Sequence, residues 1–184
     1  MTPAETRHTL SERELHEASF GELCDHIVGE HHAMLRSELP RIDKLAAKVA
    51  DHHGSERPSL AELRRAVAEL REELLEHIDR EETRLFPFCR ALDDGGPGSL
   101  AAPTTRTLLM HEKTHEKVHD KLAAMRELGE GYLPSRALCG GHRSLLESLD
   151  ALERDLRQHI HEENDVLFPQ LRGFCDSVEP AVTA

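Results

Sequence analysis

The 184-residue sequence is poor in aromatic side chains: it has no tryptophan, one tyrosine and five phenylalanines. The single tyrosine, Tyr132, falls in a predicted loop, which counts against redox chemistry that needs a tyrosyl radical. Cysteine is also scarce. The four cysteines include no Cys-x-x-Cys pair, so we expect buried free thiols rather than a disulfide framework or a thiolate metal site.

Long apolar runs and basic stripes are missing as well. No stretch approaches the roughly 20 apolar residues of a membrane span, and the first residues lack the charged-then-apolar pattern of a secretory signal. The formal net charge is -12, and no basic stripe is present that could displace counterions from a phosphate backbone. We therefore expect a cytoplasmic protein that binds neither nucleic acid nor membrane.

Histidine, by contrast, is abundant, with 14 copies. Several of these histidines lie on the apolar seams of predicted helices, where solvated surface histidines are not expected. Imidazole is a common ligand of transition metals, so this placement indicates metal binding.

One eleven-residue pattern occurs twice. The first copy reads His77-Ile-Asp-Arg-Glu81-Glu-Thr-Arg-Leu-Phe-Pro87, and the second, 82 residues later, reads His159-Ile-His-Glu-Glu163-Asn-Asp-Val-Leu-Phe-Pro169. The His, the Ile, the Glu four residues after the His, and the Leu-Phe-Pro are identical in both. A His and a Glu at this spacing lie on one face of an α-helix, roughly 6 Å apart along its axis. Both side chains can therefore reach one metal ion.

Each copy also continues an apolar seam whose residues are three or four positions apart. The first seam consists of Leu60, Leu63, Val67, Leu70, Leu74, His77 and Glu81, and the second of Leu138, His142, Leu145, Leu149, Leu152, Leu156, His159 and Glu163. The pattern of a buried helix face thus leads onto a carboxylate in both copies. A lone buried carboxylate costs several kcal/mol, so two at equivalent positions call for a cation.

The seams predict four long helices and hence an all-α fold. We expect these helices at about residues 19–54, 59–92, 104–128 and 135–172, with a flexible tail at 1–18 and a second tail at 173–184. The Gly- and Pro-rich segment 93–103 joins two similar halves. The prediction is a single domain, residues 19–172, that forms an antiparallel up-down-up-down four-helix bundle from a duplicated helical hairpin. Pro40 should kink or break the first helix.

The first and third helices each add histidines to their seams. His32 lies on the first seam, whereas its neighbour His31 lies on a shorter apolar stripe, so periodicity favours His32 but separates the two only weakly. The third seam contains both His111 and His115. His32 precedes Gly54 by 22 residues and His77 follows it by 23, so an antiparallel hairpin brings these two histidines to one level.

Two other seam histidines lie too far along their helices to join that level. His53 would be roughly 31 Å from His32, and His142 roughly 25 Å from His159, by helical rise. We interpret His53 as a histidine at a helix C-terminus and His142 as a core histidine.

The remaining set is His32, His77, Glu81, His115, His159 and Glu163, which makes two His-His-Glu groups. Each group resembles the two-histidine, one-carboxylate face that holds non-haem iron with open positions. Two ferrous ions with a bridging hydroxide would keep the carboxylates ionised and the histidines neutral. The open positions would admit a small diatomic molecule. A zinc site, a ferritin-like arrangement and a metal-free polar core fit this pattern less well.

The pattern resembles the hemerythrin-like cation-binding family, and it is most similar to the repair-of-iron-centres branch. The stretches that carry the resemblance are His31 to Pro40, Lys48-Val49 with His53-Gly54, Glu73 to Pro87, and His159 to Pro169, within about residues 20–172. The resemblance implies a four-helix bundle with an oxo- or hydroxo-bridged di-iron centre. By match of motif, its histidine ligands and bridging glutamates fall on the six residues above.

The same resemblance implies oxygen, nitric oxide or peroxide as small ligands, and damaged iron-sulfur proteins as partners in nitrosative and oxidative stress. The sequence departs from the branch because it contains no Cys-Cys pair such as the branch's N-terminal domain carries. His111 with His115 is similar to the His-x-x-x-His of oxygen carriers, so His111 is either an additional ligand or a histidine behind the ligands. His53 matches the family's His-Gly histidine, although its distance argues against a place among the ligands.

Two classes of function remain open at this point. One is a binding protein that takes up oxygen, nitric oxide or iron, as a carrier, a sensor or a repair factor. The other is an enzyme that reduces nitric oxide or decomposes peroxide. A nearby proton donor would favour turnover, and Glu82 and Glu162 are the candidates for it, although solvated surface positions are the simpler interpretation.

Overall fold

The computed structural model describes residues 10–96 and 103–178, with side chains up to residue 174. Every regular element in these ranges is a helix, so the predicted all-α class is confirmed. The α-helices are α1 (Glu12–Glu17), α2 (Phe20–Ile27), α3 (Ala33–His53), α4 (Ser59–Arg80), α5 (Phe86–Asp93), α6 (Thr105–Leu128), α7 (Gly140–His161) and α8 (Phe168–Val178).

Three π-helical turns join consecutive α-helices into longer segments. They are Val28–His32 between α2 and α3, Glu81–Leu85 between α4 and α5, and Glu162–Leu167 between α7 and α8. Short 3₁₀ turns at Glu130–Tyr132 and Pro134–Arg136 lie between α6 and α7. The helix α6 contains no such interruption.

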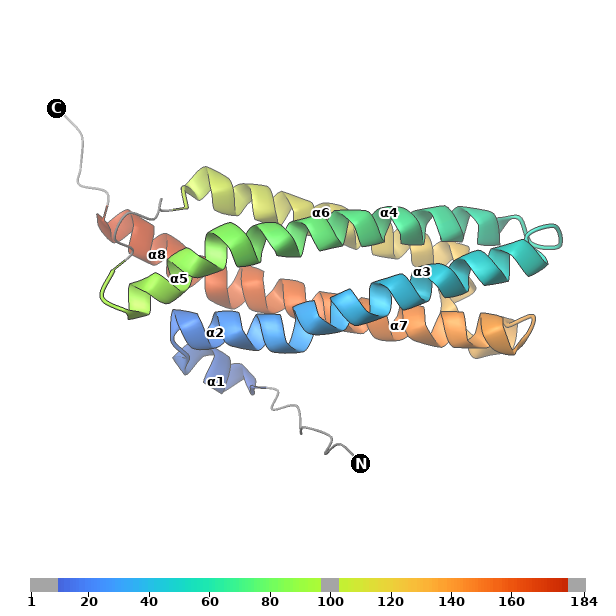
Figure 1. Cartoon of the computed structure of the whole chain (residues 1–184), viewed down its shortest axis with the longest axis horizontal. Helices are drawn as coiled ribbons and strands as arrows, with labels where there is room; N and C mark the ends of the chain where they lie inside the picture. Colours follow the sequence, from blue (N-terminus) through green and yellow to red (C-terminus); the bar gives the residue numbers. More distant parts are fainter. Residues whose placement is uncertain (1–9, 97–102, 179–184) are drawn as a thin grey trace.

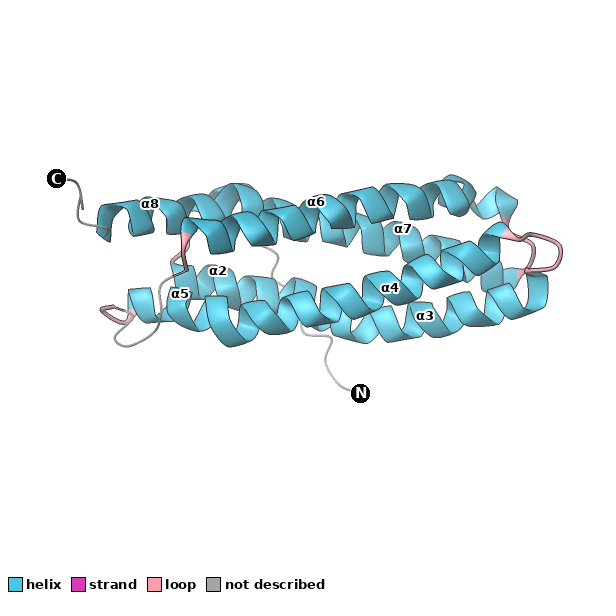
Figure 2. Ribbon diagram, turned by 90° about the horizontal axis from the view of Figure 1, so that it is seen from above, coloured by secondary structure: helices cyan, strands magenta, loops and turns pink. Residues whose placement is uncertain are grey.

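The long segments lie side by side (Figure 1). The α3 helix packs along α4 and α7, and α4 also packs against α6. The connections from α3 to α4 and from α6 to α7 lie at one end of the molecule, on the right in Figure 1, and α2, α5 and α8 lie at the other end. Figure 2 shows the same arrangement from above.

A polar layer divides the apolar core into two parts. In the segment α4–α5, the larger part ends at Ile78 and the smaller part begins at Leu85. In α7–α8 the corresponding residues are Ile160 and Val166. The buried residues between these limits are glutamates, namely Glu81, Glu162 and Glu163, and the buried His77 and His159 directly precede the limits, so the bundle places these polar side chains between two apolar regions.

The ends of the folded unit differ from the sequence expectation. The expected tail of residues 1–18 contains α1, which begins with a capping box between Ser11 and Glu14 and buries Leu15 in the smaller apolar part. At the other end α8 continues to Val178, beyond the expected boundary at 172. Residues 1–9 and 179–184 of the expected tails, and 97–102 of the expected linker, lie outside the described ranges.

A kink or a break is expected at Pro40; the α3 helix is continuous through this residue, so a break there is wrong. A capping box between Ser19 and Glu22 begins α2, at the expected start of the first long helix. No described helix is both long enough and apolar enough to cross a membrane.

Candidate metal centre

Two buried glutamates lie in the polar layer, each on its own π-helical turn. Glu81 opens the turn between α4 and α5, and Glu163 lies in the turn between α7 and α8. In both turns a phenylalanine N–H donates to the glutamate carbonyl oxygen five residues earlier, Phe86 to Glu81 and Phe168 to Glu163. The two halves of the chain thus position their glutamates in the same way. Such π-helical turns are frequent at functional sites.

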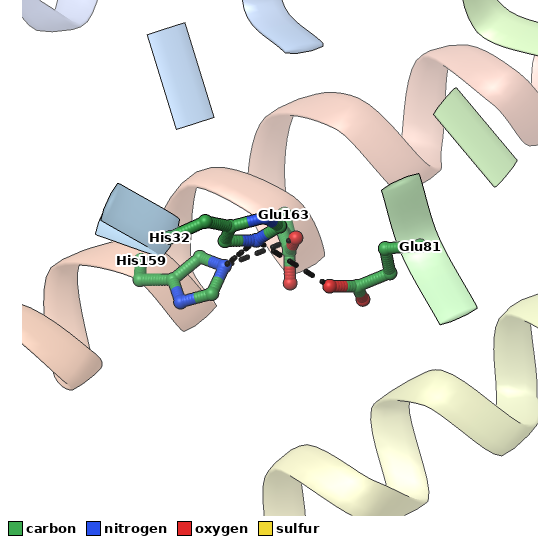
Figure 3. Close-up of side chains that lie close together, drawn as sticks. All are labelled: His32, Glu81, His159 and Glu163. Carbon is green, nitrogen blue, oxygen red and sulfur yellow. Dashed lines mark hydrogen bonds and ion pairs between the residues drawn. The ribbon is translucent and has the colours of Figure 1, made fainter. Parts of the chain in front are cut away.

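Four buried histidines face these carboxylates in two pairs. The Nε2 atoms of His32 and His159 lie 3.3 Å apart, and those of His77 and His115 lie 3.0 Å apart. We call the two groups the His32 site (His32, His159, Glu81 and Glu163; Figure 3) and the His77 site (His77, His115, Glu81 and Glu163). The structure therefore brings together all six residues that the sequence singled out.

Each glutamate divides its two oxygens between the two sites. Glu81 Oε2 lies 3.5 Å from His32 Nε2, and Glu81 Oε1 lies 2.9 Å from His77 Nε2. Glu163 repeats the arrangement: its Oε1 faces the His32 site and its Oε2 faces the His77 site, each 3.1 Å from a histidine Nε2. The two sites consequently share both carboxylates.

These donor atoms fit metal ions. Glu81 Oε2 and both carboxylate oxygens of Glu163 are buried and accept no hydrogen bond from the described residues. Two ligand atoms each about 2.1 Å from one ion, at right angles to each other, lie about 3 Å apart. The Nε2 separations within the two histidine pairs match this spacing. Imidazole and carboxylate donors in this combination suit first-row transition metals.

The electrostatics of the polar layer favour ionised carboxylates. Burial and the charge of Glu163 oppose ionisation of Glu81, but His77 and His111 outweigh them and lower the Glu81 pKa to about 2. Burial likewise opposes the charge of Glu163, and the adjacent histidines hold its pKa well below the usual range. Burial and the neighbouring His159 lower the pKa of His32, which favours the neutral imidazole that a metal needs.

Polar partners behind two of the histidines fix their orientation. His32 Nδ1 lies 2.8 Å from Glu82 Oε1, and His115 Nδ1 lies 2.8 Å from Asn164 Oδ1. Donation of Nδ1–H to these oxygens leaves the Nε2 lone pair directed into the site. Glu82 and Asn164 each follow a shared glutamate, so they are equivalent positions of the repeat. The half-buried Glu82 is thus a partner of His32 rather than a purely solvated residue.

The repeated Leu-Phe-Pro has a place in the same arrangement. The Phe86 ring stacks on His32 with 5.6 Å between ring centroids and 12° between planes. The Phe168 ring stacks on His115 with 5.9 Å and 6°. Both phenylalanines are fully buried, so each closes the apolar side of one histidine.

His111 lies behind the His77 site. Its Nδ1 is 3.0 Å from Glu81 Oε1, and its ring centroid is 5.2 Å from that of His77. His111 and His77 also line a surface pocket of about 420 Å³ with Arg80, Arg84, Leu85, Pro103, Thr107, Met110 and Thr114. A small molecule can therefore reach this side of the centre from the surface.

A third group, which the sequence reasoning missed, lies beside the His32 site. We call His26, His31 and Glu162 the outer cluster; all three side chains are buried. The interpretation of Glu162 as solvated surface is wrong, because the π-helical turn directs both Glu162 and Glu163 inward. Two sequence features could have revealed this cluster. They are the adjacent pairs His31-His32 and Glu162-Glu163, and the second apolar stripe on which His31 lies.

The distant histidines lie where the helical rise predicts. His53 Nε2 contacts Cys139 Sγ at 3.2 Å near the end of α3, and His142 Nδ1 accepts from the Leu138 N–H at 3.2 Å. Both are outside the polar layer. Cys24 and Cys89 are buried free thiols as expected, but Cys139 is exposed; the Cys175 side chain lies outside the described part.

Comparison with known proteins places this geometry in a family. Residues 25–171 match the hemerythrin HHE cation binding domain. The chain is 34% identical over 154 residues to the iron-sulfur cluster repair protein DnrN of Neisseria gonorrhoeae, covering 84% of this chain and 92% of that protein. It is 31% identical over 152 residues to the iron-sulfur cluster repair protein YtfE of Yersinia pestis (strain Pestoides F), covering 82% of this chain and 66% of that protein. The chain belongs to the hemerythrin-like family of HHE cation-binding proteins.

Proposed function

We propose that this chain is a non-haem di-iron protein of the iron-sulfur cluster repair branch, in which His32, His77, Glu81, His115, His159 and Glu163 hold two iron ions. The observation that carries the proposal is the division of the oxygens of Glu81 and Glu163 between two adjacent histidine pairs. A carboxylate that presents one oxygen to each of two sites suits a bridging ligand. We further infer an up-down-up-down four-helix bundle derived from a duplicated hairpin, because both halves supply equivalent residues.

Bound iron would supply reversible redox chemistry and open positions for oxygen, nitric oxide or peroxide. The protein's own residues orient the ligands and control access to the centre. Glu82 and Asn164 orient the imidazoles of His32 and His115, and the two phenylalanines keep water from their ring faces. The pocket at His77 and His111 admits small molecules to one side of the centre.

The repair role is supported by the names of the two relatives, both of which are iron-sulfur cluster repair proteins. Its natural partner would be an iron-sulfur protein damaged by nitric oxide or oxidants. The test is recovery of an iron-sulfur enzyme inactivated by nitric oxide, incubated without oxygen with the iron-loaded chain. We expect recovery with the native chain and none with Glu163→Ala. Equal recovery with both would contradict a repair role for this centre.

A second candidate function is an enzyme that reduces nitric oxide or decomposes peroxide at the same centre. The observation that favours it is His111, whose Nδ1 contacts Glu81 and whose ring lines the open pocket. A histidine in that position can move a proton between the pocket and the centre. Product formed over many turnovers would support the enzyme, whereas one reversible binding event per centre would support a carrier or sensor.

A further inference from the structure

The outer cluster is a further group of potential metal ligands, and none of its three residues belongs to the six described above. Nε2 of His26 and Nε2 of His31 each lie 3.2 Å from the same oxygen, Glu162 Oε2. These three atoms come from different helical segments, α2, the first π-helical turn and the last one. Two imidazole nitrogens and one carboxylate oxygen that converge in this way make a face suited to a divalent transition metal.

Residues outside the cluster bond only to its outward atoms, whereas His31 Nε2 and Glu162 Oε2 are hydrogen-bonded to each other at 3.2 Å. His26 is only 8% exposed, and its Nε2 lies 3.2 Å from Glu162 Oε2 but makes no hydrogen bond with the described residues. Glu162 uses its other oxygen, Oε1, to accept from Gln158 at 2.9 Å. His31 Nδ1 lies 3.1 Å from Asp155 Oδ1. A carboxylate behind the Nδ1–H of a histidine is the usual support of a metal-ligating imidazole.

An acidic entrance leads to this cluster. His26 lines a surface pocket of about 570 Å³, and its other lining residues are Leu10, Glu14, Glu17, Ala18, Glu22, Asp25, Gly29 and Glu30, so no lysine or arginine from residues 10–96 or 103–174 lines it. Arg13 and Arg90 approach Glu17 and Asp25 from outside the pocket. Among the described residues, the entrance therefore carries more carboxylates than cations. A pocket lined by carboxylates raises the local concentration of divalent cations at its opening.

A row of imidazoles connects the entrance with the His32 site. The ring centroids are 5.9 Å apart from His26 to His31, 5.2 Å from His31 to His159, and 5.0 Å from His159 to His32. The His31 and His159 rings are parallel, with 5° between their planes. Glu162 and Glu163 are consecutive residues on the same π-helical turn. Ligand atoms are therefore spaced along the whole path from the pocket to the shared carboxylates.

We propose that His26, His31 and Glu162 form a third cation site that captures a divalent first-row transition metal from the acidic pocket and passes it to the His32 site. Asp155 is a positioning residue that holds His31 through Nδ1. The site differs from the His77 side, where a pocket reaches the centre without an intervening donor set. The loading role rests on the proposed function, whereas cation binding by the outer cluster can be measured independently of it.

The test uses the full-length chain, freed of metal, and Co²⁺ alone as the probe. Equilibrium dialysis should give three Co²⁺ per native chain and two for His26→Gln, a substitution six residues away from His32 in the sequence. Glu162→Gln should also lose the third ion, and His52→Gln, which alters an exposed histidine, should keep it. Crystals soaked in Co²⁺ should show anomalous density between His26, His31 and Glu162. Two ions in the native chain with no density there would overturn the site.

The loading role is tested by the rate at which metal-free chain takes up Fe²⁺ without oxygen. We expect His26→Gln to slow filling of the paired sites by about 10-fold, the lower end of the effect of supporting residues on metal sites, while the final content of two ions stays unchanged. An unchanged filling rate in a variant that has lost the third ion would overturn the loading role. Failure of the paired sites to fill at all would instead contradict the proposed di-iron function.

Discussion

The His32 site and the His77 site are built from equivalent residues but face different surroundings. Each has two histidine Nε2 atoms about 3 Å apart and one oxygen from each of two shared glutamates. Beside the His77 site lie His111 and an open pocket, whereas beside the His32 site the outer cluster fills the space. The comparison teaches that two sites with equivalent inner donors can have different neighbouring residues and therefore different access from the surface.

The largest expected effect, on iron content, comes from removing a carboxylate that the two sites share. Glu81→Ala or Glu163→Ala takes one carboxylate oxygen from both sites at once, so we expect each variant to fall from two irons to at most one and to lose magnetic coupling between them. Iron analysis with Mössbauer spectroscopy measures both quantities. Glu116→Ala, an exposed glutamate on α6, serves as the control. Two coupled irons in either test variant would exclude the bridging assignment.

The next effect tests whether the stacked phenylalanines are equivalent. Phe86→Ala and Phe168→Ala each remove a fully buried ring, and we expect each to lower the free energy of unfolding of the metal-free chain by about 3–5 kcal/mol because a cavity remains. Urea unfolding followed by circular dichroism gives these values. A large decrease in the free energy of unfolding for one variant and none for the other would show that the two phenylalanines are not equivalent.

The Nδ1 partners offer a sharper comparison of one site with the other. We expect Glu82→Ala to weaken metal binding at the His32 site and Asn164→Ala at the His77 site, each by about 10- to 100-fold. The effect of Glu82→Ala should be the larger, because a carboxylate forms a stronger hydrogen bond with imidazole than an amide does. Competition with a chelator of known affinity measures both. If Asn164→Ala had the larger effect, the strength of the Nδ1 hydrogen bond would not determine how tightly the histidine binds the metal.

The smallest effect concerns access on the open side. His111→Ala should keep two irons and slow the reaction with peroxide or nitric oxide by about 10-fold, which is less than the roughly 100-fold effect of losing a dedicated general acid, because water in the open pocket can also carry a proton. Stopped-flow absorbance of the reduced, iron-loaded chain measures the rate, with His119→Ala on the same helix as control. Loss of one iron in His111→Ala would instead make His111 a ligand of the His77 site.

Much of this arrangement could be predicted from the sequence because it follows helical periodicity. The repeated His-x-x-x-Glu and the apolar seams lead to His77, Glu81, His159 and Glu163, and hairpin geometry adds His32. Helical rise also excludes His53 and His142 from the polar layer. These inferences need only a regular spacing of 3.6 residues per turn.

The part that the sequence did not predict depends on departures from that spacing. A π-helical turn adds a residue and allows two consecutive side chains to face inward, which buries His31 beside His32 and Glu162 beside Glu163. An apolar pattern with residues three or four positions apart places only one of two consecutive residues on the buried face. It therefore cannot assign both members of such a pair to the core. The continuous helix through Pro40 is a similar case, because packing along α4 and α7 supports the helix where local propensity opposes it.

The central claim is that two metal ions share Glu81 and Glu163, and the most direct measurement is anomalous scattering at the iron edge from crystals of the iron-loaded chain. We expect two peaks about 3.5–4 Å apart, the usual spacing of paired metals, one between His32 and His159 and the other between His77 and His115. A single peak, or two peaks that do not lie on either side of the two carboxylates, would contradict it.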